Sequence, residues 1–179
     1  MIREGQKVLF LDLDGVLSDP EPAQATAHER LVPGRVRRLS DLVDRVGCRV
    51  VVSSTWRRNP RTYRGLTADQ LEEVLRERGY TGRVHDITPM HEEAHFDDEI
   101  ARIRGDEILE WCRAQNTPPS AIVVLDDVAL RGPLAAYVVR TDAYRGLTDE
   151  DVQRAIDLFK YPPRGRAPWL SSELRGVSV

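Results

Sequence analysis

Two aspartates two residues apart, Asp12 and Asp14, stand in the segment FLDLDGVL near the start of the chain. They follow an apolar run, and side chains two residues apart on an extended strand point to the same face. Gly15 comes next and allows a sharp turn because it has no Cβ. Of two neighbouring carboxylates, one can attack as a nucleophile while a metal shields it, and the other can carry a proton. The pair therefore predicts nucleophilic and acid/base chemistry at a strand end.

Polar residues also end two later apolar runs. RVVVSST places Ser53 and Ser54 at the end of one run, and AIVVL is followed by Asp126 and Asp127. Four carboxylates at one edge of a sheet repel one another unless a cation neutralises them. The spacing therefore predicts a metal site at the edge where these runs meet.

β-Branched apolar runs alternate with amphipathic stretches, which predicts right-handed βαβ units. The expected fold class is α/β, with a doubly wound, mostly parallel sheet and helices on both faces. Ligands of such sheets bind at the carboxyl ends of the strands. The expected strands are residues 7–13, 49–55, 83–87, 121–125 and 136–140, and the expected helices are residues 33–47, 67–78, 106–115 and 148–159.

Composition restricts the class of protein. The chain has 179 residues, 41% hydrophobic and 31% charged, with a net charge of −3, which is typical of a globular domain and excludes a polybasic one. We expect one domain over residues 1–160 and an irregular, Pro- and Arg-rich tail over residues 161–179. Two cysteines suit a reducing compartment, and no run approaches the roughly 20 apolar residues of a membrane span. The expectation is a cytoplasmic protein without a membrane partner; its oligomeric state cannot be read from the sequence.

The ordered motifs FLDLDGVL, VVVSST and VVLDD resemble the first, second and fourth motifs of the haloacid dehalogenase (HAD) superfamily. SSTWRR, RGDEILEW, LDD and RTDAYRGLT are more narrowly similar to the phosphatase domain of bacterial and phage nucleic-acid end-repair proteins, the polynucleotide kinase-phosphatase type. The resemblance runs in order from residue 8 to about residue 159. It implies a Rossmann-like HAD phosphatase with a minimal cap or none.

The resemblance assigns roles to individual residues. Asp12 would attack phosphorus and form an aspartyl-phosphate, and Asp14 would protonate the leaving oxygen and then accept a proton from water. Ser53 would donate a hydrogen bond to a phosphate oxygen, with Ser54 as the alternative.

Mg²⁺ is the implied cofactor. Its ligands would be Asp12, the main-chain carbonyl of Asp14 and one carboxylate of the pair Asp126 and Asp127. We favour Asp127 as the direct ligand and Asp126 as its support. Such oxygen ligands suit a hard divalent cation.

The third motif departs from the superfamily, which usually has a lysine there. Lys7 and Lys160 are the only lysines of the chain. Arg104 occupies the matching position, with Arg102 as the alternative, and arginine can clamp phosphate through two hydrogen bonds. A second departure is Val16, where many relatives have threonine.

The substrate is the least determined feature. Arg57 and Arg58 begin a basic stretch, RRNPRTYR, that could bind a nucleic-acid backbone. We expect a phosphomonoester substrate, either a DNA or RNA end or a nucleotide or small metabolite. A catalytically idle binding module is the alternative from another class. HEEAH at residues 91–95 also spells the zinc-protease pattern H-E-x-x-H, but it lacks a long amphipathic helix.

Overall fold

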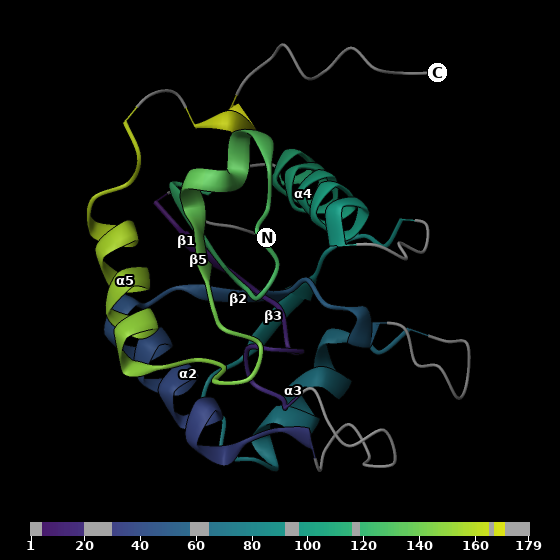
Figure 1. Ribbon diagram of the computed structural model, residues 1–179, viewed down its shortest axis with the longest axis vertical. Coiled ribbons are helices and arrows are strands. Elements are labelled where there is room, and N and C mark those ends of the chain that lie inside the picture. The colour runs from purple at the N-terminus through teal and green to yellow at the C-terminus, as the bar shows by residue number, and fades with distance from the viewer. Residues whose placement is uncertain are drawn as a thin grey trace.

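The computed structural model describes residues 5–19, 30–57, 65–91, 97–115, 119–164 and 167–170. Within these residues the strands are β1 (Lys7–Leu11), β2 (Arg49–Val52), β3 (Val84–Ile87), β4 (Ala121–Asp126) and β5 (Val138–Arg140). The α-helices are α2 (Pro33–Val46), α3 (Ala68–Arg76), α4 (Asp97–Ala114) and α5 (Asp149–Lys160) (Figure 1). Short 3₁₀ helices are η1 (Thr55–Arg57), η2 (Gly132–Tyr137) and η3 (Pro168–Leu170).

The strands form one sheet in the order β3-β2-β1-β4-β5, and every neighbouring pair is parallel. The chain runs outward from β1 to β3 and then returns to the other side of β1, so the winding reverses at the central strand. Leu11 of β1 pairs with Val52 of β2 and with Leu125 of β4, which brings the carboxyl ends of the three strands level. This arrangement confirms the doubly wound α/β fold, and its reversal point is where such sheets bind ligands.

Both faces of the sheet are covered, because side chains alternate along each strand. Leu9 and Leu11 of β1 pack in the core shared with α2, α3 and α5. Val8 and Phe10 belong to the opposite core, which α4 closes. Figure 1 shows α2 and α5 on one side of the sheet and α4 on the other. Burial on both faces explains why the central strands are continuous apolar runs.

Capping residues set most helix boundaries where the sequence predicts them. Thr67 begins α3 with a capping box to Gln70, and Thr148 begins α5 with one to Asp151. Gly47 ends α2 at a φ of 67°, a left-handed conformation in which its N–H donates to the Val43 carbonyl.

Several expected boundaries are wrong. Strand β1 ends at Leu11, not at residue 13, and helix α3 ends at Arg76, not at residue 78. Strand β2 ends at Val52, not at residue 55, because Thr55 already belongs to η1.

Helix α4 begins at Asp97, not at residue 106. Its first turns show no clear amphipathic pattern in the sequence, because the polar Arg104 is buried there together with the small residues Ala101 and Gly105. Strand β5 begins at Val138, not at residue 136. The preceding residues form η2, which has a proline in its first turn.

Part of the tail is ordered, although we expected it to be irregular. Trp169 of η3 donates its indole N–H to the Pro119 carbonyl at 2.9 Å. Its ring packs edge-on against Tyr137, with 5.0 Å between the ring centroids. This turn therefore helps to close the core beside α4.

Candidate active site

Asp12 lies at the middle of the carboxyl edge of the sheet, directly after β1. Its backbone N–H donates to the Leu125 carbonyl of β4 at 2.9 Å, and the N–H of Ser53 donates to the Leu11 carbonyl of β1 at 2.8 Å. These bonds extend the two parallel ladders past the strand ends, so the backbone of Asp12 is fixed between β2 and β4. The residue is only 3% exposed, and a buried carboxylate needs positive charge nearby.

Arg104 of α4 supplies that charge. Its Nη1 lies 2.5 Å from Asp12 Oδ2 and 2.7 Å from Asp126 Oδ2. Burial on its own would lower the pKa of Arg104, but the two carboxylates outweigh burial and raise the pKa above its ordinary value. The competing candidate, Arg102, is largely exposed and pairs with Asp106 instead. The geometry therefore brings Arg104, and not Arg102, to Asp12.

The end of β4 brings two more carboxylates to Asp12. Asp126 is fully buried: one oxygen accepts from Arg104, and the other accepts from the Val128 N–H at 2.8 Å. Burial, followed by the charge of Asp12, raises the pKa of Asp126 to about 7 despite the guanidinium. Asp127 is half-buried, and the same two causes raise its pKa. The positive charge of one arginine therefore does not balance the negative charge of the three carboxylates.

This cluster has the chemistry of a magnesium site. Asp12, Asp126 and Asp127 can each direct one oxygen so that the three oxygens lie within 4.8 Å of one another. Carboxylate oxygens are the ligands that a hard divalent cation prefers. Gly15 makes the approach possible, because a Cβ at this position would collide with the Asp127 carboxylate, and the residue has a φ of +66°. The residues present therefore fit the implied Mg²⁺.

Asp14 is more exposed than Asp12 and is held by other side chains. Its Oδ1 accepts hydrogen bonds from Arg30 at 2.6 Å and from Ser18 at 3.0 Å. Its Oδ2 accepts one from Thr55 at 3.3 Å. The Asp14 side chain is 36% exposed, in contrast to the buried Asp12. The Asp14 carboxylate is therefore accessible from solvent.

The two serines after β2 differ in their surroundings. The Oγ of Ser53 accepts a 3.2 Å hydrogen bond from Thr88, and the residue directly continues β2 next to β1. The Oγ of Ser54 instead accepts from the Trp56 N–H at the start of η1. Both serines are buried, and Ser53 is the one in register with the end of β1.

Arg57 is buried, and its guanidinium forms hydrogen bonds within the protein. Its guanidinium donates to the carbonyl of Ser54 (2.7 Å), the hydroxyl of Thr88 (2.6 Å), the carbonyl of Pro89 (2.6 Å) and the carboxylate of Glu107 (2.9 Å). Its side chain is 5% exposed, and burial lowers its pKa although Glu107 opposes the change. This contradicts the expectation that Arg57 binds a nucleic-acid backbone, since its donors are used within the protein. Through its bonds to the Ser54 carbonyl and to Glu107, the residue instead links the end of β2 to α4.

Other sequence-based candidates fall partly or wholly outside the described residues. Arg58 and the rest of the basic stretch to residue 64 lie there, as does His95 of the H-E-x-x-H pattern. His91 is described, and its Nε2 lies 2.7 Å from Glu110. Nothing in this contact resembles a zinc site.

Sequence reasoning missed three residues that hold the site together: Arg30, Thr88 and Glu107. Glu107 lies in the quoted segment RGDEILEW, one turn after Arg104. This helical spacing could have indicated that Glu107 lies on the same face of the helix as Arg104. Arg30 is 16 residues from Asp14 in a stretch without periodicity. No pattern in the sequence identifies it.

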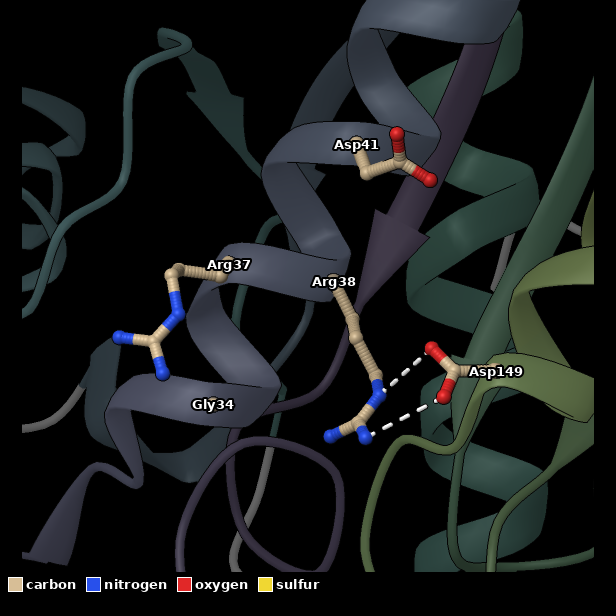
Figure 2. Close-up of a pocket in the computed structure, with 5 residues that line it drawn as sticks. All are labelled: Gly34, Arg37, Arg38, Asp41 and Asp149. Carbon is tan, nitrogen blue, oxygen red and sulfur yellow. Dashed lines mark hydrogen bonds and ion pairs between the residues drawn. The ribbon is translucent and has the colours of Figure 1, made fainter.

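A surface hollow elsewhere is lined by Gly34, Arg37, Arg38, Asp41 and Asp149 (Figure 2). Arg38 donates to both carboxylate oxygens of Asp149, at 2.8 and 3.3 Å, so two of these charges neutralise each other. None of the carboxylates around Asp12 lines this hollow. It carries no argument for catalysis.

Comparison with known families gives one finding that covers the site. The model of the HAD domain in Swiss Army Knife RNA repair proteins matches residues 8–152, a range that includes every described residue around Asp12. No curated protein and no solved structure matches the chain. Among the described residues, none of the helices is both long and apolar enough to cross a membrane.

Proposed function

Because the chain belongs to the family of the HAD domain in Swiss Army Knife RNA repair proteins, we propose that it is a magnesium-dependent phosphatase that removes a terminal phosphate from a nucleic acid. Family membership supports phosphatase activity of the HAD type. The observation that carries the proposal is the buried Asp12 at the reversal point of the sheet, with Arg104 and the carboxylates of β4 around it.

Asp12 is the nucleophile in this proposal. One of its oxygens attacks phosphorus, the bond from phosphorus to the ester oxygen breaks, and an aspartyl-phosphate forms. The transition state spreads negative charge over three equatorial oxygens. Arg104, already 2.5 Å from Asp12, balances this charge, and Ser53 donates to one of the phosphate oxygens.

Asp14 carries the proton in both halves of the reaction. It gives its proton to the departing ester oxygen, which leaves as an alcohol. It then takes a proton from water while the water oxygen attacks phosphorus, which releases inorganic phosphate and restores Asp12. The partly exposed position of Asp14 beside the buried Asp12 supports this division of labour.

Asp12, Asp127 and the main-chain carbonyl of Asp14 would hold the Mg²⁺, and Asp126 would support them. When bound, the ion supplies positive charge that lets carboxylate and phosphate approach each other. Asp126 suits a supporting role because its two oxygens accept from Arg104 and from the Val128 N–H. Burial, followed by the charge of Asp12, raises the pKa of Asp126 and of Asp127, and a cation at this site would oppose both effects.

The substrate class is tested by a panel of phosphate-release assays. We expect release from oligonucleotides with a 3′- or 5′-terminal phosphate to exceed release from mononucleotides and small sugar phosphates. The opposite order would replace the nucleic-acid proposal with a nucleotide or metabolite phosphatase. No release from any member, in Mg²⁺, would favour the idle binding module.

A further inference from the structure

Side chains from three places in the sequence donate hydrogen bonds to the Asp14 carboxylate, and its two oxygens accept bonds of different number and length. Oδ1 accepts two hydrogen bonds, from Arg30 at 2.6 Å and from Ser18 at 3.0 Å. Oδ2 accepts one long hydrogen bond, from Thr55 at 3.3 Å. A 2.6 Å bond between a guanidinium and a carboxylate is much stronger than a 3.3 Å bond that a neutral hydroxyl donates to the carboxylate. Oδ1 is therefore the anchored oxygen, and Oδ2 is the one that can exchange partners.

Arg30 is itself held in place. Its carbonyl accepts from the Asp19 N–H at 3.2 Å, and the next residue, Leu31, forms an antiparallel bridge with Ser18. Its guanidinium lies over the Trp56 ring, 5.6 Å from the centroid, and the Trp56 side chain is buried. Backbone pairing and the cation–π contact thus restrict the arginine before any substrate binds. Such restriction is what a positioning group requires.

We propose that Arg30 is the positioning residue of the acid/base Asp14, and that it makes Oδ2 the oxygen that carries the proton. The inference rests on the proposed phosphatase function and adds a residue to it. Arg30 and Ser18 continue to donate their hydrogen bonds to Oδ1 through both half-reactions. The proton leaves Oδ2 for the ester oxygen as the bond from that oxygen to phosphorus breaks. Oδ2 later takes a proton from the water that attacks the aspartyl-phosphate.

The test compares two aryl phosphates of the same kind, phenyl phosphate and 2,4-dinitrophenyl phosphate. The phenolate is a strong base that needs a proton to leave, whereas the dinitrophenolate leaves without one. General acid catalysis contributes about 10²–10⁴-fold, so we expect Arg30→Ala to lower kcat/KM for phenyl phosphate about 10- to 100-fold. For dinitrophenyl phosphate we expect a loss below about threefold. The ratio kcat/KM covers the steps up to loss of the leaving group, so slow hydrolysis of the aspartyl-phosphate does not mask the difference.

Three further variants sharpen the result. Arg45→Ala removes an exposed arginine that also pairs with a carboxylate, Asp41, and should leave both substrates unaffected. Arg30→Lys keeps the charge and should recover part of the lost phenyl phosphate activity. In the Asp14→Asn background, Arg30→Ala should have no additional effect on phenyl phosphate, because the arginine acts through that carboxylate.

The outcomes separate this inference from the function on which it rests. A wild-type protein that hydrolyses neither ester contradicts the phosphatase proposal itself. A wild-type protein that hydrolyses both, with an Arg30→Ala variant that loses both equally or neither, overturns the positioning role and leaves the phosphatase in place. If Arg30→Ala does not fold, Arg30→Lys decides the matter. A selective loss on phenyl phosphate supports the inference, and an equal loss on both esters overturns it.

Discussion

At the scale of residues, one arginine holds two carboxylates that would otherwise repel each other. Arg104 bridges Asp12 and Asp126 at 2.5 and 2.7 Å in a buried setting, where a charge interaction is stronger than at the surface. The same guanidinium is placed to balance charge on a transferred phosphoryl group. This contact supports the proposal that Arg104 takes the place of the lysine that the superfamily usually has.

Arg104→Ala should therefore lower kcat/KM for an aryl phosphate by about 10²–10³-fold, the typical cost of removing one group that stabilises a transition state. Arg102→Ala is the matched control, since Arg102 lies two residues away, is largely exposed and pairs with Asp106. It should stay within about twofold of wild type. Steady-state assays of both variants decide the point, and a larger loss for Arg102→Ala would reassign the third motif.

Residue patterns predicted this site unevenly. Asp12, Ser53, Asp126 and Asp127 could be placed because parallel strands bring their carboxyl ends to one edge. The burial of Arg57 could not be predicted, because an arginine beside other arginines is typical of a solvent-exposed loop. Its partners come from segments about 30 and 50 residues further along the chain, and local sequence does not report such contacts.

At the scale of elements, α4 is fastened to the end of β2 by the buried pair of Arg57 and Glu107. Glu107 lies one turn after Arg104, and it also accepts a hydrogen bond from the His91 N–H at 2.8 Å. This fastening keeps α4 in the position from which Arg104 reaches Asp12.

Arg57→Ala should destabilise the protein by about 3–5 kcal/mol, because it leaves the Glu107 carboxylate buried and unpaired. Replacing both residues together, Arg57→Met with Glu107→Leu, should cost less than the single change. Urea unfolding measures both free energies. An Arg57→Ala variant as stable as wild type, like an Arg45→Ala control on the surface, would show that the pair does not fasten the helix.

His85 of the outer strand β3 makes the stability of the fold depend on pH. Although His85 is exposed, desolvation by the surrounding protein, followed by the charges of Arg49 and Arg83, lowers its pKa below 6.5. The unfolded chain then binds the proton more readily, so this group stabilises the fold above pH 6.5 and loses that contribution as pH falls through its folded pKa. The wild type should lose stability relative to His85→Gln between about pH 8 and pH 5 in urea unfolding. Parallel pH curves for the two proteins would contradict this.

Caps made several helix boundaries predictable, and buried apolar runs made the starts of β1, β2 and β4 predictable, but not the ends of β1 and β2. Strands β1, β2 and β4 are continuous apolar runs, and Thr67, Gly47 and Thr148 mark helix ends. The start of α4 and the start of β5 were not, because a buried arginine and a 3₁₀ turn have no hydrophobic period.

At the scale of the whole molecule, the reversal of winding at β1 leaves an edge where loops from both halves of the sheet meet. Bringing the carboxylates together at this edge lowers the stability of the folded protein. Burial and the charge of Asp12 raise the pKa of Asp126 to about 7. A cation that relieves this cost must stabilise the folded protein.

Mg²⁺ should therefore raise the melting temperature in the absence of any substrate. At about 100-fold above its Kd the ion contributes about 2.7 kcal/mol, which corresponds to about 5–10 °C for a chain of this size. EDTA should abolish the shift, and Asp127→Asn should reduce it, while Asp106→Asn on the surface of α4 should keep it. A melting temperature that does not respond to Mg²⁺ would contradict the metal site.

The central claim is that Asp12 becomes phosphorylated, and trapping this intermediate tests it most directly. The protein is mixed with 2,4-dinitrophenyl phosphate, quenched in acid within one turnover and reduced with borohydride, which converts an aspartyl-phosphate to homoserine. The account predicts homoserine at position 12 in the peptide mass spectrum, and neither the modification nor turnover in Asp12→Asn. Turnover with residue 12 unmodified, and retained in Asp12→Asn, would contradict it.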